Sequence, residues 1–352
     1  MTPAYAIAKE PFCPGVARWL FACALLVACM VLLGGYTRLS GSGLSITQWK
    51  PVHGVIPPLS QAAWQEEFAA YRQTPQYAAI NSNMTLDGFR RIYWPEYAHR
   101  LLGRLAGAAF FLPFLWFSAR RAFSPRFGVR LLLIFALGAA QGGVGWVMVK
   151  SGLADGPYVN HLRLAAHLAL AFTLFALLLA GALDALGANA GEARLPLRMK
   201  KALCALFCAL AAQIVLGALL AGLHGGLIYN TFPTMNGEWL PADALAQTPW
   251  WNGIFHNIAA LQFAHRWLAA LLGAGYLLWW WRARNYDKSL LILMLPLLVI
   301  MQFLLGIATL LTQASLPLAM AHQMTALGLF GLTVAILHGF SHSPHKRNEI
   351  NY

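Results

Sequence analysis

Long apolar runs recur along the chain and constrain its fold more than any other feature. Charged residues make up only 11% of the 352 residues, whereas soluble domains carry about 25%. A run of about 20 apolar residues is long enough to cross a hydrocarbon core of about 30 Å as an α-helix. We therefore expect an all-α integral membrane protein with eight transmembrane helices. The predicted segments are residues 16–39, 97–118, 129–150, 162–186, 200–223, 259–281, 289–311 and 317–340.

The Lys and Arg residues behind the net charge of +13 gather in alternate connections. Basic residues cluster after the second, fourth and sixth predicted segments and in both tails, whereas the connection 224–258 has none. Basic connections stay on the cytoplasmic side of a membrane. We expect a multi-pass protein of the bacterial cytoplasmic (inner) membrane with both termini in the cytoplasm. The same distribution explains the charge without a nucleic-acid partner, and membrane lipid is the expected surrounding.

The second half of the sequence repeats features of the first in the same order. "RLSGSGLS" is echoed by "GLHGGLIYN", "EYAHR" by "QFAHR", "QGGVGW" by "QFLLGI", and "RLAAHLALA" by "LAMAHQMTA". Four crossings return a chain to its starting side, so the two halves have the same orientation. The pattern predicts two tandem four-helix bundles related by a pseudo-twofold axis. We place the halves at residues 1–190 and 191–352.

Four histidines occupy equivalent places in this repeat, near the outward-facing starts of the even-numbered segments. Ionisable groups at membrane depth are costly, so they indicate function. Two imidazoles on different helices can ligate a heme iron from both sides, provided the neighbouring residues are small. A structural zinc site instead needs four closely spaced ligands, a pattern that we do not find. The histidines are His99, His167, His265 and His322, and the residues four positions later are Gly103, Ala171, Ala269 and Ala326.

Arginines and one carboxylate accompany these histidines. Arg100 and Arg266 directly follow their histidines and either reach toward lipid phosphate or pair with heme propionates. Arg38 and Arg163 are further candidates near the outer surface.

Glu96 lies three residues before His99, where the second half has Gln262. A carboxylate can transfer protons and an amide cannot, although a Glu can also favour the start of a helix. We predict that the first half is the reactive site and that the second holds a resident cofactor.

The chain resembles the heme A synthases over nearly its whole length. The motifs that carry the resemblance are "GGYTRLSGSGLS", "WKPVHGVIPPL", "MTLDGFRRIYWPEYAHRLLGR", "QGGVGWVMVKSGL" and the four repeated histidines. It implies an enzyme that oxidises the C8 methyl group of heme O to a formyl group by two successive hydroxylations. One branch of that family has a cysteine pair in the first outward loop, which this sequence lacks, so the chain is similar to the proteobacterial and mitochondrial branch.

The resemblance also implies roles for single residues and for partners. His99 and His167 would hold the substrate heme O, His265 and His322 would ligate a heme b cofactor, and Glu96 would be the catalytic carboxylate. From their places in the sequence, Arg100 and Arg163 are predicted to bind the substrate heme and Arg266 the cofactor heme. A heme O synthase would act upstream and the product heme A would serve assembly of a terminal cytochrome oxidase, while the electron donor and the formation of a homo-oligomer stay open.

A non-catalytic membrane cytochrome b that passes on electrons from quinol is the alternative function. It explains the four histidines equally well, but it does not explain why one half has Glu96 where the other half has Gln262. A transporter is a third, weaker alternative, since the sequence does not indicate helices that break at the membrane midplane.

Overall fold

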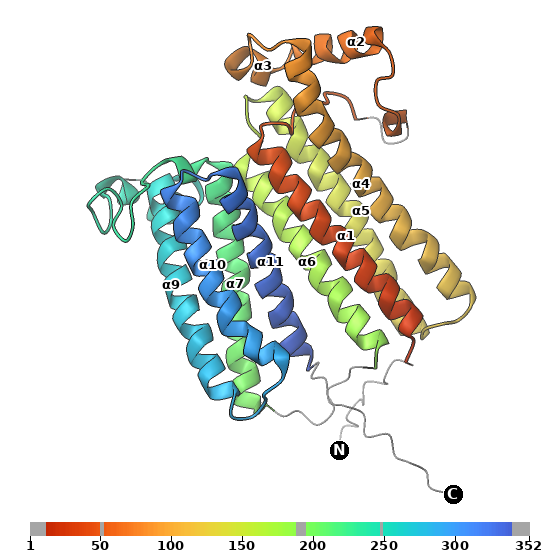
Figure 1. The fold of residues 1–352 in the computed structure, drawn as a ribbon, viewed down its shortest axis with the longest axis vertical. Coiled ribbons are helices and arrows are strands. Elements are labelled where there is room, and N and C mark those ends of the chain that lie inside the picture. Colours follow the sequence, from red (N-terminus) through yellow and green to blue (C-terminus); the bar gives the residue numbers. More distant parts are fainter. Residues whose placement is uncertain (1–11, 50–52, 188–194, 247–248, 340–352) are drawn as a thin grey trace, which may run out of the picture.

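The computed structural model describes residues 12–49, 53–187, 195–246 and 249–339, which form helices and connecting loops with no strand among them (Figure 1). The long helices are α1 (Pro14–Leu39), α4 (Leu86–Ala119), α5 (Pro125–Ala154), α6 (His161–Ala185), α7 (Leu197–Gly222), α9 (Ile258–Ala283), α10 (Leu290–Leu311) and α11 (Leu316–His338). The short helices are η1 (His53–Val55), α2 (Gln61–Tyr71), α3 (Pro75–Ile80), η2 (Gly225–Leu227), η3 (Ala242–Leu245) and α8 (Trp250–His256).

The long helices lie in two groups, as Figure 1 shows. In the first group α1 and α5 each pack against both α4 and α6, and in the second α7 and α10 each pack against both α9 and α11. Helices α1 and α6 meet α7 and α11 where the groups join. The predicted boundary between residues 190 and 191 falls in 188–194, outside the described residues.

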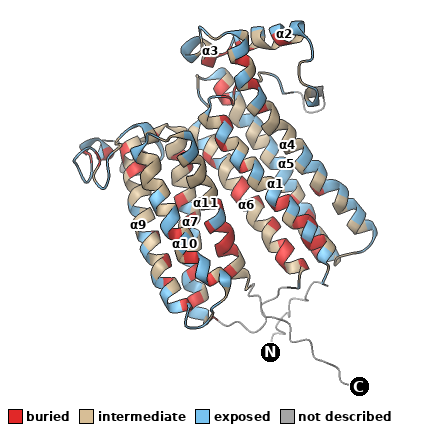
Figure 2. Cartoon of the chain, in the orientation of Figure 1, coloured by how far each residue is buried: buried red, intermediate tan, exposed pale blue. Residues whose placement is uncertain are grey.

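Buried residues concentrate on the helices at this junction. Figure 2 shows them along α1, α6 and α11, whereas α4 and α5 expose most of their surface. Outer helices present large apolar side chains, among them Leu112, Leu133, Leu271 and Leu297, each more than 60% exposed. An apolar surface of this extent needs a nonaqueous surrounding.

Within the described residues, seven helices are long and apolar enough to cross a membrane. Helix α9 is as long but falls outside this set, and it carries Gln262, His265 and Arg266 near its start. The expectation of an all-helical multi-pass membrane protein is confirmed to this extent.

Helix α4 begins eleven residues before the predicted start at Tyr97, because Thr85 caps it. The Thr85 hydroxyl oxygen accepts a hydrogen bond from the Gly88 amide at 3.2 Å, a contact that stabilises a helix start by about 1 kcal/mol. Pro95 lies inside the helix, ahead of the predicted start at Tyr97. Because residues 86–96 are largely polar, a search for apolar runs does not detect this first part of the helix.

An aromatic cluster holds this early part of α4 against α2 and α3. Trp64, Tyr71, Phe89 and Tyr93 are buried together, and the ring centroids of Trp64 and Tyr93 lie 4.9 Å apart. Helix α2 buries Trp64 and Tyr71 on the side that faces this cluster. The first connection is therefore a packed layer rather than a free loop.

Polar contacts join the two groups of helices at both ends. Asp184 of α6 accepts hydrogen bonds from Arg130 of α5 and, at 2.7 Å, from His338 of α11. At the opposite end the Arg38 guanidinium, at the end of α1, donates to the carbonyl oxygen of Ala221 in α7. These contacts fix α6 to α11 and α1 to α7, and Arg130 ties α5 to α6 within the first group.

Close packing of α6 against α7 predicts that Gly222→Ala destabilises the protein. An added Cβ would lie 2.5 Å from the His161 Cβ and 2.8 Å from its Cα, so backbone would have to move. We expect a loss of about 1–3 kcal/mol, seen as a lower thermal midpoint in detergent. Gly15→Ala is the control, because its new Cβ would make an ordinary contact of 3.5 Å with Phe117; equal midpoints for both variants would contradict the prediction.

Candidate functional site

The four repeated histidines lie on four different helices, at a similar depth. His167, His265 and His322 fall in the second turn or the turn after it on α6, α9 and α11, and His99 lies further along the extended α4. These four helices begin at the same end of the molecule in Figure 1. The structure thus places the histidines toward one side of the proposed membrane region.

The contacts between helices arrange the histidines as two pairs. Since α4 and α6 share α1 and α5 as neighbours, they face each other diagonally in the first group, as α9 and α11 do in the second. Each group of helices therefore carries one pair of histidines, on two helices that lie diagonally opposite each other.

Each imidazole rests against a glycine of a neighbouring helix. A Cβ added at Gly34 of α1 would lie 3.0 Å from His99 Nε2, and one added at Gly217 of α7 would lie 3.0 Å from His265 Cε1. The remaining pairs repeat this contact, at 2.9 Å for Gly145 against His167 and 3.0 Å for Gly306 against His322. Any larger residue would displace the ring, so the glycines set where each imidazole lies.

The imidazole nitrogens fit metal ligation. The Nδ1 atoms of His167, His265 and His322 are buried and have no hydrogen-bond partner in the described chain, although buried polar atoms usually have one. No group of three or more His, Cys, Asp or Glu side chains suited to a metal ion occurs among the described residues. A zinc-type cluster is thus not present there, whereas two histidines per iron suit a heme.

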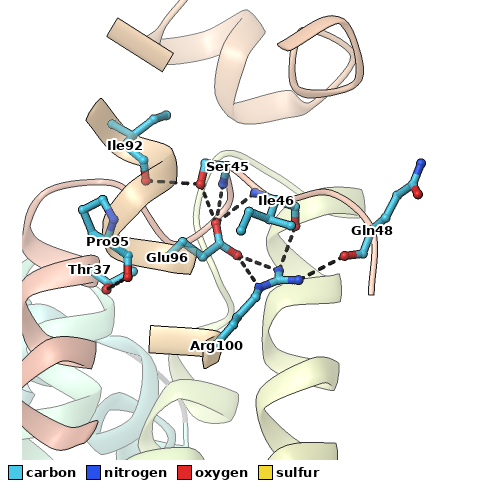
Figure 3. A network of polar contacts seen from close by, with 8 residues as sticks. All are labelled: Thr37, Ser45, Ile46, Gln48, Ile92, Pro95, Glu96 and Arg100. Carbon is cyan, nitrogen blue, oxygen red and sulfur yellow. Dashed lines mark hydrogen bonds and ion pairs between the residues drawn. The ribbon is translucent and has the colours of Figure 1, made fainter. Parts of the chain in front are cut away.

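Glu96 is buried in a network of polar contacts between α4 and the loop that follows α1 (Figure 3). Its Oε2 accepts hydrogen bonds from the Ser45 amide and hydroxyl, both at 2.7 Å, and from the Ile46 amide at 2.9 Å. Its Oε1 accepts two more from Arg100, at 3.0 and 2.6 Å. All five partners donate, which suits the acceptor-only ionised carboxylate.

Arg100 completes this network by donating to two carbonyl oxygens of the same loop. Its Nη2 lies 2.8 Å from Ile46 O and its Nη1 lies 3.0 Å from Gln48 O. Glu96 and Arg100, one helical turn apart, together hold residues 45–48 against α4. We call this set of contacts the first clamp.

Gln262 and Arg266 form an equivalent second clamp on α9. Arg266 donates to Tyr229 O, Thr231 O and Thr234 O, and to the Gln262 side-chain oxygen at 2.6 Å. The Gln262 amide group donates to Gly225 O at 2.9 Å and to Ile228 O at 2.6 Å. Glu96 thus receives hydrogen bonds from loop amides, whereas Gln262 gives them to loop carbonyls.

The reversed direction of these hydrogen bonds explains locally why one half has a glutamate at this position and the other a glutamine. The sequence did not reveal this cause. Both guanidinium groups bind loop carbonyl oxygens. The pairing of Arg100 and Arg266 with heme propionates stays a prediction. Arg163, at the start of α6, donates to Val147 O at 3.0 Å, and Arg38 donates to α7 as described above.

Sequence reasoning missed the residues that flank the histidines on neighbouring helices. Besides the four glycines, Gln141, Gln213 and Gln302 reach the histidine positions. A signal was present, since a glutamine precedes a glycine by four residues in "QGGVG", "QIVLG" and "QFLLG", and that spacing places both on one helix face.

The other histidines near this end join loops and helix ends. The rings of His161 and His256 lie 5.2 Å apart, and His161 Nε2 lies 2.9 Å from Phe255 O. His224 packs on Tyr158 with ring centroids 4.3 Å apart. Burial and the nearby Arg38 charge lower the pKa of His224. His342 and His345 lie outside the described residues.

The fold and the site define a multi-helix membrane protein that pairs histidines across each of two helix groups. The chain belongs to the cytochrome oxidase assembly protein (COX15-CtaA) family, whose model matches residues 17–334. Proteins named heme A synthase from Nitrosospira multiformis and Parvibaculum lavamentivorans are each 45% identical to it, over 92% of this chain and 92% and 93% of their own lengths. A heme A synthase from a Bradyrhizobium strain is 46% identical over 93% of this chain and 91% of its own.

Proposed function

We propose that this protein is a heme A synthase, an enzyme that oxidises the C8 methyl group of heme O to a formyl group by two successive hydroxylations. The observation that carries the proposal is the identity of about 45% with proteins of that name over nine-tenths of both chains. The paired histidines support it, because both the substrate and the product would be hemes that need iron ligands.

In this proposal His99 and His167 hold the substrate heme O, and His265 and His322 ligate a resident heme b. The glycine contacts and the unpartnered Nδ1 atoms support both assignments. The bound hemes would supply the redox chemistry, while this chain orients them and manages protons. Arg100 and Arg163 would lie beside the first heme and Arg266 beside the second.

We further propose that α9 crosses the membrane as an eighth span and that the two helix groups form a pseudo-twofold repeat with halves 1–190 and 191–352. The contacts support the repeat: the same number of residues separates Gly34 from Gly217, which face equivalent histidines, as separates Ile46 from Tyr229, which bind equivalent arginines. The basic connections favour cytoplasmic termini, with the histidine pairs toward the periplasmic side of a bacterial inner membrane.

Glu96 is proposed as the carboxylate of the first site. It would fix the loop 45–48 and Arg100 over that site through the first clamp. To accept a proton during oxidation it would have to release one of its five donors. The lack of cysteines in the described outward loops favours the branch without the loop cysteine pair, since all five cysteines lie at Cys13 or within α1 and α7.

The test is extraction of the pigments from protein purified from a host that makes heme O, with a host that cannot make heme O as the control. We expect heme b together with heme O or heme A from the first host and heme b alone from the second. Heme b alone from both would favour an electron-transferring cytochrome b instead, and no heme from either would overturn both functions. The proposal implies two partners. A heme O synthase would supply heme O, and a cytochrome oxidase would receive heme A.

A further inference from the structure

Three glutamines share one position relative to the histidine pairs. Gln141 on α5, Gln213 on α7 and Gln302 on α10 each lie four residues before a glycine that contacts an imidazole. Residues four apart lie on the same helix face. Each glutamine therefore faces the same neighbouring helix as the glycine does, about one turn away.

Two of these glutamines tie their helix to the backbone of a histidine. The Gln141 amide group donates to His167 O at 3.1 Å, and the Gln213 amide group donates to His265 O at 2.9 Å. The Gln302 amide nitrogen instead lies 3.4 Å from His322 Nε2. The side-chain oxygens of all three glutamines are buried without a partner in the described chain. Buried polar atoms usually have a hydrogen-bond partner, so internal hydrogen bonding alone does not explain why glutamine occupies these positions.

The fourth equivalent position holds Met30. It precedes Gly34 on α1 by four residues, and Gly34 contacts His99. A thioether has no N–H or O–H group to donate, so the backbone of His99 has no amide tether of the kind that Gln213 gives His265. The Met30 methyl group lies 3.4 Å from where a Cβ of Gly103 would be, one turn after His99, and so covers that small residue.

We propose that Gln141 and Gln213 are positioning residues for the heme-ligating histidines, and that Met30 makes His99 the ligand that releases. The inference rests on the proposed function, in which the first heme enters as substrate and leaves as product while the second stays. His322 lacks a backbone tether too, but the Gln302 amide still lies 3.4 Å from its ring, whereas no glutamine in the described chain faces His99. His99 can therefore move away from iron with the fewest contacts broken. Gln213 and Met30 occupy equivalent positions in the two halves. The site beside Gln213 would thus retain its heme, and the site beside Met30 would exchange its heme.

The experiment exchanges the two residues and measures heme loss from the purified holoprotein to excess apomyoglobin, with the lost heme identified by extraction. Gln213→Met should speed loss of the second-site heme about three- to tenfold, the change expected for one hydrogen bond. Met30→Gln should slow loss of the first-site heme by a similar factor. Met30→Leu, which keeps an apolar side chain, should lose both hemes at the wild-type rates.

Rates within twofold of wild type for both exchanges would overturn the proposal. So would equal acceleration at both sites in Gln213→Met, because that result indicates general loosening. If Gln213→Met does not fold, Gln141→Met tests the same tether at the first site, where faster loss of that heme is expected and an unchanged rate contradicts it. Protein that carries heme b in both sites should still lose it in two phases, and the proposal then requires that Gln213→Met speeds one phase while Met30→Gln slows the other. The proposal can therefore fail or hold even if no heme O or heme A is found and the proposed function fails.

Discussion

Replacing Glu96 with Ala should both destabilise the protein and abolish heme A formation. The variant leaves the Arg100 guanidinium without its carboxylate and removes the acceptor for the Ser45 and Ile46 amides. Glu96 is 4% and Arg100 19% exposed, so little water can replace the lost contacts. Removing one partner of a buried ion pair costs about 3–5 kcal/mol. Thermal unfolding in detergent and heme extraction measure the two effects.

Glu96→Gln separates a positioning role from proton transfer. An amide at this place turns a donor toward groups that also donate, so we expect a lower thermal midpoint as well as reduced heme A formation. If Glu96 acts only as a proton acceptor, the midpoint will equal that of the wild type while activity is lost. Full stability would therefore contradict the clamp as we describe it.

Gln262→Glu is the matched variant for the second clamp. It would place a carboxylate against the carbonyl oxygens of Gly225 and Ile228, which now receive hydrogen bonds from the amide. Two acceptors that face each other without a donor are unfavourable when buried. We expect this variant to lower the midpoint too, although it adds the residue that the first half carries at the same place.

The clamps show where prediction from the sequence reaches its limit. "EYAHR" and "QFAHR" identified Glu96 and Gln262 as equivalent and located both arginines beside them. Whether a loop turns amides or carbonyls toward a side chain depends on backbone angles in residues 45–48 and 225–231, which composition does not determine. The difference was therefore visible in the sequence, but its hydrogen-bonding cause was not.

The helices, too, were predictable from the sequence only in part. Apolar runs located the long helices, because hydropathy reports on the lipid-facing and buried residues directly. The start of α4 was missed because Phe89 and Tyr93 bury against α2 rather than in lipid, among polar neighbours that lower the local hydropathy. Helix α9 is the reverse case, since its length is clear while the polar residues near its start lower its apolar character.

Gly145→Val should empty the first site of heme and leave the second filled. A Cβ at this position would lie 2.9 Å from His167 Cε1, and the two methyl groups of valine would push the imidazole further. Overpacking of this kind costs about 1–3 kcal/mol, which corresponds to a change of about fivefold to more than a hundredfold in an equilibrium constant. We expect heme O and heme A to fall at least tenfold in extracts of purified protein, with heme b content kept.

Gly138→Val on the same helix is the control, because Gly138 is exposed and nothing lies within 4 Å of its added Cβ. Both variants place the same β-branched residue in α5, so any general effect on helix formation or membrane insertion is shared. Only the contact with His167 differs between them. Loss of heme b along with heme O in Gly145→Val would mean that α5 supports both sites, and equal heme content in the two variants would mean that the glycine does not set the position of the imidazole.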